Sequence, residues 1–160
     1  MMKYLLSSKI TVITIGFAVH LSGCASNGFE TWNTEITCDQ QHFTITSFCK
    51  PSKDPETMNT CKGEQLLAKG DQTPVNLPLA ATRAINKELL ATHWKCQQVG
   101  NTSYLEIRYA AGLGNIPGNE AVEFFDLQSR PVTDQSLQNS IIRTGKKTNK
   151  GRVKSIMPEQ

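Results

Sequence analysis

No run of apolar residues in this 160-residue sequence is long enough to cross a bilayer as a helix. Such a helix needs about 20 consecutive apolar residues. The best candidate, residues 10–21 (ITVITIGFAVHL), is shorter and is interrupted by threonines and a histidine. It follows Lys3 and Lys9 with no acidic residue before it, an order that is typical of a signal peptide. We therefore interpret residues 1–23 as a signal peptide.

The sequence also lacks the motifs that accompany most catalytic sites. Only His42 and His93 follow the signal segment, and no G-x-S-x-G nucleophile sequence accompanies them, so both are interpreted as surface residues. Glu123 and Asp126 would point to opposite faces of one strand. They are therefore expected to be solvated, and not to form the carboxylate pair of a glycosidase. We predict no catalytic residue, no metal site and no cofactor.

Cys24 directly follows Leu21-Ser22-Gly23 at the end of the apolar run. This segment resembles the lipobox of bacterial lipoproteins. In that family the cysteine is acylated, with palmitate-type chains, and the signal is cleaved before it. The resemblance implies a lipid bilayer as the partner of Cys24. Ala25 resembles the residue that sends such proteins to the outer membrane, facing the periplasm. Two or more acyl chains give stable anchoring.

The charge of the chain changes once residues 1–23 are set aside. Loss of Lys3 and Lys9 leaves 15 basic and 14 acidic residues, a net charge of about +1. Six of the basic residues lie from Arg143 onward, with one acid, Glu159. We predict a short membrane tether over 24–31, one periplasmic domain over 32–142 and a flexible basic tail over 143–160. The tether keeps the domain within roughly 30 Å of the membrane.

The cysteines other than Cys24 are even in number and widely spaced: Cys38, Cys49, Cys61 and Cys96. No pair has the C-x-x-C spacing of zinc or redox sites. An even set in an exported domain predicts two disulfides, with three possible connectivities. We favour Cys49–Cys61, which would close the proline-containing loop between them, together with Cys38–Cys96. The other two connectivities remain open.

Alternating apolar and polar residues predict short strands at 31–38, 42–49, 93–99, 103–110 and 121–127, with a weaker one at 64–70. Helical spacing predicts one main helix over 79–91. A short second helix could begin at Asp134 as its N-cap and stop at Gly145. The expected fold class is α+β: a small antiparallel sheet or meander with one main helix, two disulfides and a disordered basic tail.

Three groups of residues are candidates for binding a partner. Leu113 and Ile116 are apolar residues in the glycine-rich segment 112–119, which could equally be a plain connector. Tyr104 and Arg108 would face outward from their strand and have the composition of an interface. The predicted tail could bind head groups, peptidoglycan or an acidic protein, or could merely aid solubility; its candidates are Lys146, Lys147, Lys150 and Arg152.

These expectations favour a non-enzymatic lipoprotein that acts as a binding or accessory subunit of a cell-envelope or secretion assembly. The partner would be a periplasmic or envelope protein, and nucleic acid is not expected in that compartment. The alternative is a periplasmic inhibitor of an enzyme such as lysozyme, because small disulfide-bridged lipoproteins of that kind are similar in size and layout. A hydrolase is the least favoured function.

Overall fold

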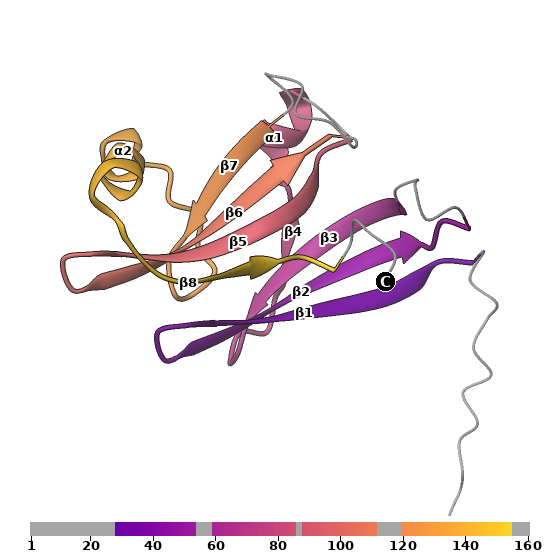
Figure 1. Ribbon diagram of the computed structural model, residues 1–160, viewed down its shortest axis with the longest axis horizontal. Helices are drawn as coiled ribbons and strands as arrows, with labels where there is room; N and C mark the ends of the chain where they lie inside the picture. Colours follow the sequence, from indigo (N-terminus) through magenta and orange to yellow (C-terminus); the bar gives the residue numbers. More distant parts are fainter. Residues whose placement is uncertain (1–27, 54–58, 86–87, 112–119, 155–160) are drawn as a thin grey trace, which may run out of the picture.

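The computed structural model describes residues 28–53, 59–85, 88–111 and 120–154, which form two antiparallel four-stranded sheets (Figure 1). The first sheet has the order β1 (Glu30–Cys38), β2 (Gln41–Lys50), β3 (Thr60–Ala68) and β4 (Val75–Leu77). The second has the order β7 (Glu120–Phe125), β6 (Thr102–Ala110), β5 (Leu90–Val99) and β8 (Lys146–Arg152). The helices are α1 (Ala80–Ile85) and α2 (Gln135–Thr144). Neither helix of these ranges has the length and apolar character needed to span a membrane.

The hydrophobic core lies between the two sheets. Alternate residues of each strand point inward, so Phe43 and Ile45 on β2 share one core with Leu105 and Ile107 on β6. All four side chains are fully buried. The strands therefore alternate as the sequence predicts, but the fold is dominated by β-structure and is not a balanced α+β arrangement.

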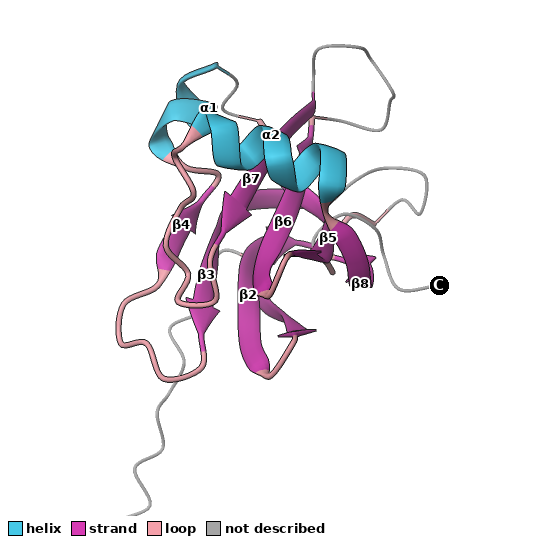
Figure 2. Cartoon of the chain, turned by 90° about the vertical axis from the view of Figure 1, so that its left-hand side faces the viewer, coloured by secondary structure: helices cyan, strands magenta, loops and turns pink. Residues whose placement is uncertain are grey.

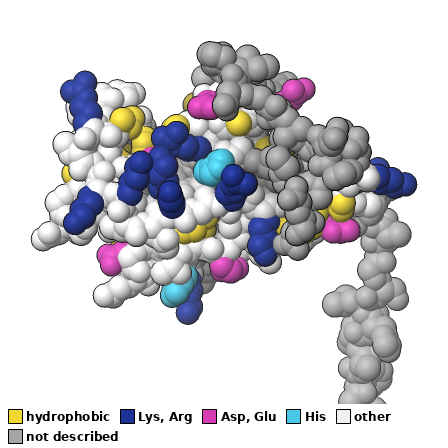
Figure 3. Space-filling view, viewed as in Figure 1, with side chains coloured by type: hydrophobic (Ala, Val, Ile, Leu, Met, Phe, Trp, Pro, Cys, Tyr) yellow, Lys and Arg dark blue, Asp and Glu magenta, His cyan; other side chains and the backbone are white. Residues whose placement is uncertain are grey.

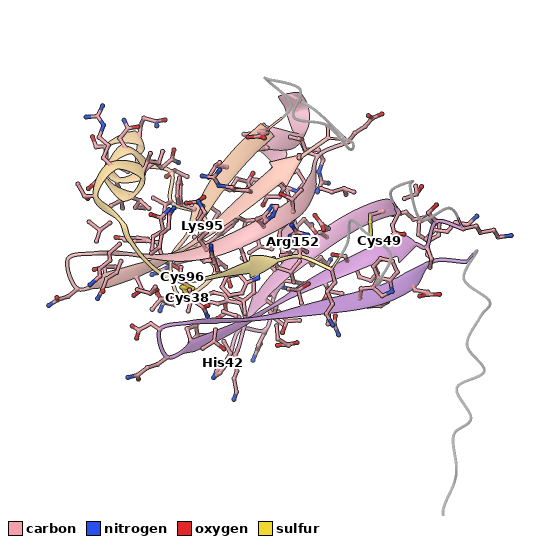
Figure 4. The ribbon with its side chains drawn as sticks, in the orientation of Figure 1. Cys38, His42, Cys49, Lys95, Cys96 and Arg152 are labelled. Carbon is pink, nitrogen blue, oxygen red and sulfur yellow. A yellow bond between two sulfur atoms is a disulfide. The ribbon has the colours of Figure 1, made fainter. Side chains whose placement is uncertain are left out.

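The two disulfides are Cys38–Cys96 and Cys49–Cys61, the pairing that the sequence favours. Cys49–Cys61 joins neighbouring strands β2 and β3 across the loop between them. Cys38–Cys96 joins β1 of the first sheet to β5 of the second, and the two residues lie together in Figure 4. One bridge therefore ties the two sheets and the other closes a loop within one sheet.

The predicted main helix over 79–91 is wrong in its extent. α1 ends at Ile85, and β5 begins at Leu90 and pairs with β6 from there. Leu89 and Ala91 are buried in the core between the sheets. Strand pairing and burial outweigh the helical spacing of this segment, because intrinsic helix propensity is a weak preference.

The predicted short helix near the C-terminus is present as α2. The Asp134 side chain accepts hydrogen bonds from the backbone N–H groups of Ser136 and Leu137, and Gly145 follows the last turn. Ile141 packs with Tyr104 and Phe124 on the outer face of the second sheet. α2 therefore covers one end of that face (Figure 2).

The prediction of a disordered tail from residue 143 is wrong for residues 146–152, which form β8. This strand pairs with β5, and Val153 directly after it is buried in the core. Gly151 lies against the Trp94 indole, where an added Cβ would come within 2.7 Å of ring atoms. The segment lacks an apolar alternation of its own, and it is ordered because β5 offers a free edge. Residues 155–160 lie outside the described residues.

Candidate functional site

Basic residues gather on the outer face of the second sheet, in rows that cross three strands. In one row, His93 on β5 lies between Arg108 on β6 and Arg152 on β8. In the next, Lys95 lies between Glu106 and Lys150. Directly paired residues of antiparallel strands point to the same side of the sheet. We call the five basic members of these rows the basic face: His93, Lys95, Arg108, Lys150 and Arg152.

Figure 3 shows Lys and Arg side chains gathered around a histidine over the middle of the molecule. In Figure 4, Lys95 and Arg152 rise from β5 and β8 on the side away from the first sheet. The surface around the basic face forms an open depression of about 520 Å³, also lined by Trp94 and Gly151. The basic face is therefore an accessible surface with a shallow hollow.

Glu106 is the one carboxylate in these two rows, and its oxygens are already bonded. It is 2% exposed and accepts hydrogen bonds from Lys95 Nζ (3.0 Å), Arg108 Nε (2.6 Å) and Gln97 Nε2. Burial alone would raise the pKa of Glu106, but the hydrogen bonds and charges of Arg108 and Lys95 outweigh it and hold the pKa below its ordinary value. Glu106 is thus ionised at neutral pH and orients two members of the basic face.

His93 lies at the centre of the positive charge. Burial, and then the charges of Arg152, Arg108 and Lys95, lower the pKa of His93 below its ordinary value. Its ring is therefore neutral at pH 7. Its Nδ1 lies 3.0 Å from Thr92 Oγ1, and its Nε2 forms no hydrogen bond within the described residues.

The basic face has more positive charge than its surroundings neutralise. Among the described residues, Lys150 and Arg152 form no salt bridge, whereas Lys95 and Arg108 share the single carboxylate of Glu106. Like charges placed directly opposite each other destabilise a sheet. Lys95 faces Lys150 across the β5–β8 pair. The arrangement is unfavourable for the isolated fold and favourable for binding an anion.

The structure brings together some of the predicted partner-binding residues and separates others. Arg108, Lys150 and Arg152 meet on the basic face, although the sequence assigned them to two separate groups. Lys146 and Lys147 are exposed at the other end of β8 and pair with Gln98 and Gln97.

The other predicted partner contacts are Tyr104 and the apolar residues of segment 112–119. Tyr104 is not an exposed interface residue, because α2 covers it and leaves it 9% exposed. Leu113 and Ile116 lie outside the described residues.

Sequence reasoning missed His93 and Lys95 as members of a site. Their alternation with Trp94 and Cys96 places them on the polar side of their strand, and that signal alone is typical of an ordinary surface. The information that was missing is the pairing of β8 with β5. That pairing puts Lys150 and Arg152 next to them.

Glu123 is buried and not solvated, which corrects the sequence-based expectation. It accepts hydrogen bonds from Tyr109 Oη (2.6 Å) and the Leu79 N–H (2.9 Å) inside the protein. Burial and then the charge of Glu123 raise the pKa of Tyr109 well above its ordinary value. Glu64 is likewise buried and accepts from Ser47 Oγ and the Ala91 N–H. These carboxylates hold backbone and side-chain donors of the two sheets in place.

Within the described ranges, no three histidine, cysteine or carboxylate side chains are grouped in a way that could hold a metal ion. No protein-family model, curated protein or solved structure matches this chain. The features that indicate a function are therefore the geometry of the basic face and the resemblance of residues 21–24 to a lipobox.

Proposed function

We propose that this protein is an exported lipoprotein, anchored through acylated Cys24, that acts as a non-enzymatic binding subunit in the cell envelope. Its basic face holds an anionic component of an envelope or secretion assembly. The two disulfides support a location outside the cytoplasm, where such bridges persist. The lipobox supports the anchor, with the outer membrane as its destination and the periplasm as the compartment of the domain.

The observation that carries this proposal is the surplus of cations on the outer face of β5, β6 and β8, where Lys95 lies directly opposite Lys150. Four permanent cations and a histidine occupy two adjacent rows, and the only carboxylate among them is buried. A face that served only solubility would gain from interspersed acids, which remove the repulsion. Anionic partners gain from such a surface in both affinity and association rate.

The test uses the intact lipoprotein, isolated from chemically cross-linked envelopes. We expect the wild-type protein to carry a stoichiometric envelope component, and the double variant Lys150→Glu/Arg152→Glu to lose it. Lys69→Glu is the matched control, because Lys69 is an exposed lysine in the turn directly after β3, away from the basic face. Capture that weakens with added salt supports an electrostatic contact. Equal capture by the wild type and the double variant would rule out the basic face as the binding surface.

The anchor is tested separately with Cys24→Ala. We expect this variant to be released from the membrane fraction after its signal is cleaved by another route. Membrane retention without an uncleaved signal would contradict lipidation. Inhibition of lysozyme by the purified protein, unchanged in the double variant, would favour the alternative function over the binding subunit.

A further inference from the structure

We propose that the group recognised by the basic face is a phosphate monoester, seated on the row Arg108–His93–Arg152. The inference rests on the proposed function only in placing the ligand on this face. The monoester would belong to a phosphorylated glycan or lipid head group of the envelope, which are the sources of this chemistry within reach of an anchored domain.

The row has the composition of an oxyanion site, because two arginines flank a histidine on three neighbouring strands. Neighbouring strands lie about 4.8 Å apart, so the two arginines start on either side of His93 and can converge above its ring. A guanidinium presents planar pairs of donors that match phosphate oxygens. Arg108 uses Nε for Glu106, and its terminal nitrogens form no hydrogen bond within the described residues. Arg152 has no salt bridge among them either.

Half of the site is held in place before any ligand arrives. Glu106 binds both Arg108 and Lys95, at 2.6 and 3.0 Å, from a buried position. The other half, Lys150 and Arg152, lies on the edge strand β8 with freely exposed side chains. A ligand would therefore meet two oriented cations first and gather the other two around it. Preorganisation of this kind lowers the entropy lost on binding.

The amount of charge favours a monoester over a carboxylate or a phosphodiester. The four permanent cations exceed the charge of Glu106 by three. A carboxylate or a diester carries one negative charge, whereas a phosphate monoester carries about 1.5 to 2 at pH 7 and offers three strong acceptor oxygens. The hollow of about 520 Å³ is larger than a phosphate group, so it leaves room for the sugar or glycerol that bears the phosphate.

The first experiment titrates the full mature lipoprotein, held in detergent micelles, with three small probes by calorimetry. The probes are glucose 1-phosphate, inorganic phosphate and glucuronate, which carries a carboxylate on a similar ring. We expect glucose 1-phosphate to bind about tenfold more tightly than glucuronate, because the monoester forms more charge-assisted hydrogen bonds. Arg152→Gln and Arg108→Gln should each weaken its binding about tenfold or more, and Lys69→Glu should leave it unchanged.

A second readout locates the ligand. Bound phosphate should raise the pKa of the His93 ring, measured by NMR, because a nearby negative charge favours the protonated ring. His42 on the first sheet serves as the internal control and should not respond. Binding of glucose 1-phosphate that leaves the His93 resonance unchanged, or that survives both arginine substitutions, would overturn the site.

The remaining experiments distinguish a lipid phosphate from a glycan phosphate, and either of these from an acidic protein partner. Vesicles containing phosphatidic acid, a monoester, should bind the protein more tightly than vesicles containing the same charge of phosphatidylglycerol, a diester, if the ligand is a lipid. Preference for soluble glucose 1-phosphate over both vesicles assigns a glycan. An acidic peptide that binds more tightly than the monoester would overturn the phosphate class while the proposed function stands. In one further outcome, the double variant captures the envelope component as well as the wild type does, while glucose 1-phosphate still binds to the basic face. That combination would contradict the proposed function but support the phosphate site.

Discussion

The polar side chains on the outer faces of the two sheets are paired in opposite ways. On the first sheet, side chains opposite each other form hydrogen bonds: Thr44 with Glu35, Thr46 with Asn33, and Gln65 with Asn76. On the second, Lys95 faces Lys150 and His93 lies between two arginines. The first face is satisfied by its own residues. The second keeps positive charge that no carboxylate of the described residues neutralises, and this difference is the reason we propose it as the binding surface.

The largest effect should come from the bridge between the two sheets. Replacing Cys38 and Cys96 by alanine opens a loop of 58 residues, and replacing Cys49 and Cys61 opens one of 12. The chain-entropy model gives about 4 kcal/mol of lost stability for the first change and about 3 kcal/mol for the second. Urea denaturation of both double variants measures the difference. A greater loss of stability from opening the 12-residue loop would contradict the chain-entropy account of the two bridges.

The next largest effect should come from Gly151, which lets β8 lie against Trp94. A side chain here meets the indole within 2.8 Å at three atoms, so Gly151→Val should cost about 1–3 kcal/mol and loosen the basic face. Gly63→Ala on the first sheet is the matched control, because an added Cβ meets nothing within 4 Å there. Thermal unfolding of the two variants compares them. Similar melting temperatures would show that β8 tolerates a side chain at this position.

A smaller effect, of opposite sign, should follow from removing a repelled charge. Arg152→Gln should stabilise the fold by a few tenths of a kcal/mol at low salt, since like charges on neighbouring strands repel. The gain should shrink at about 1 M salt, where screening is strong. Urea denaturation at two salt concentrations checks this. If Arg152→Gln destabilises the fold at both salt concentrations, Arg152 has a structural role. Its charge would then not lower the stability of the fold, as a role in binding alone predicts.

The smallest effect should appear in the pH dependence of stability. Because the pKa of His93 is lowered in the folded protein, the unfolded chain binds the proton first as the pH falls. The contribution of His93 is therefore fully present above its unfolded pKa of about 6.5 and is lost as the pH drops through and below it. Comparing His93→Gln with His42→Gln between pH 7.5 and 5 isolates this loss. No difference between their profiles would contradict the shift.

Much of the fold could be predicted from local features of the sequence. Alternation placed Leu105, Ile107 and Tyr109 inward, and all three are buried. Asp134 and Gly145 marked the ends of α2, because caps are local hydrogen-bonding devices. Cys38, Cys49 and Cys96 fall on the apolar sides of their alternating segments, which agrees with their buried positions in the two bridges. These signals depend on neighbours only a few residues away.

The candidate site could not be read in the same way. Lys150 and Arg152 looked like a charged tail, and His93 and Lys95 looked like the polar side of an ordinary strand. Residues more than 50 positions apart in the chain meet only when β8 docks on β5. The spacing of residues within one segment does not predict the pairing of β8 with β5. Pairing between distant segments depends on which strand edge the rest of the fold leaves open.

By itself the sequence determined the strand alternation and the caps of α2. It only favoured the cysteine pairs that the structure contains, and the lipid anchor at Cys24 stays a prediction. The tertiary structure alone decided that there are two sheets, that Glu123 and Glu64 are buried, and that the basic C-terminal segment is a strand. The physical reason is that local periodicity sets which way a side chain points within its own element. Which charges face each other is set by long-range pairing, and on the second sheet that pairing placed cation beside cation.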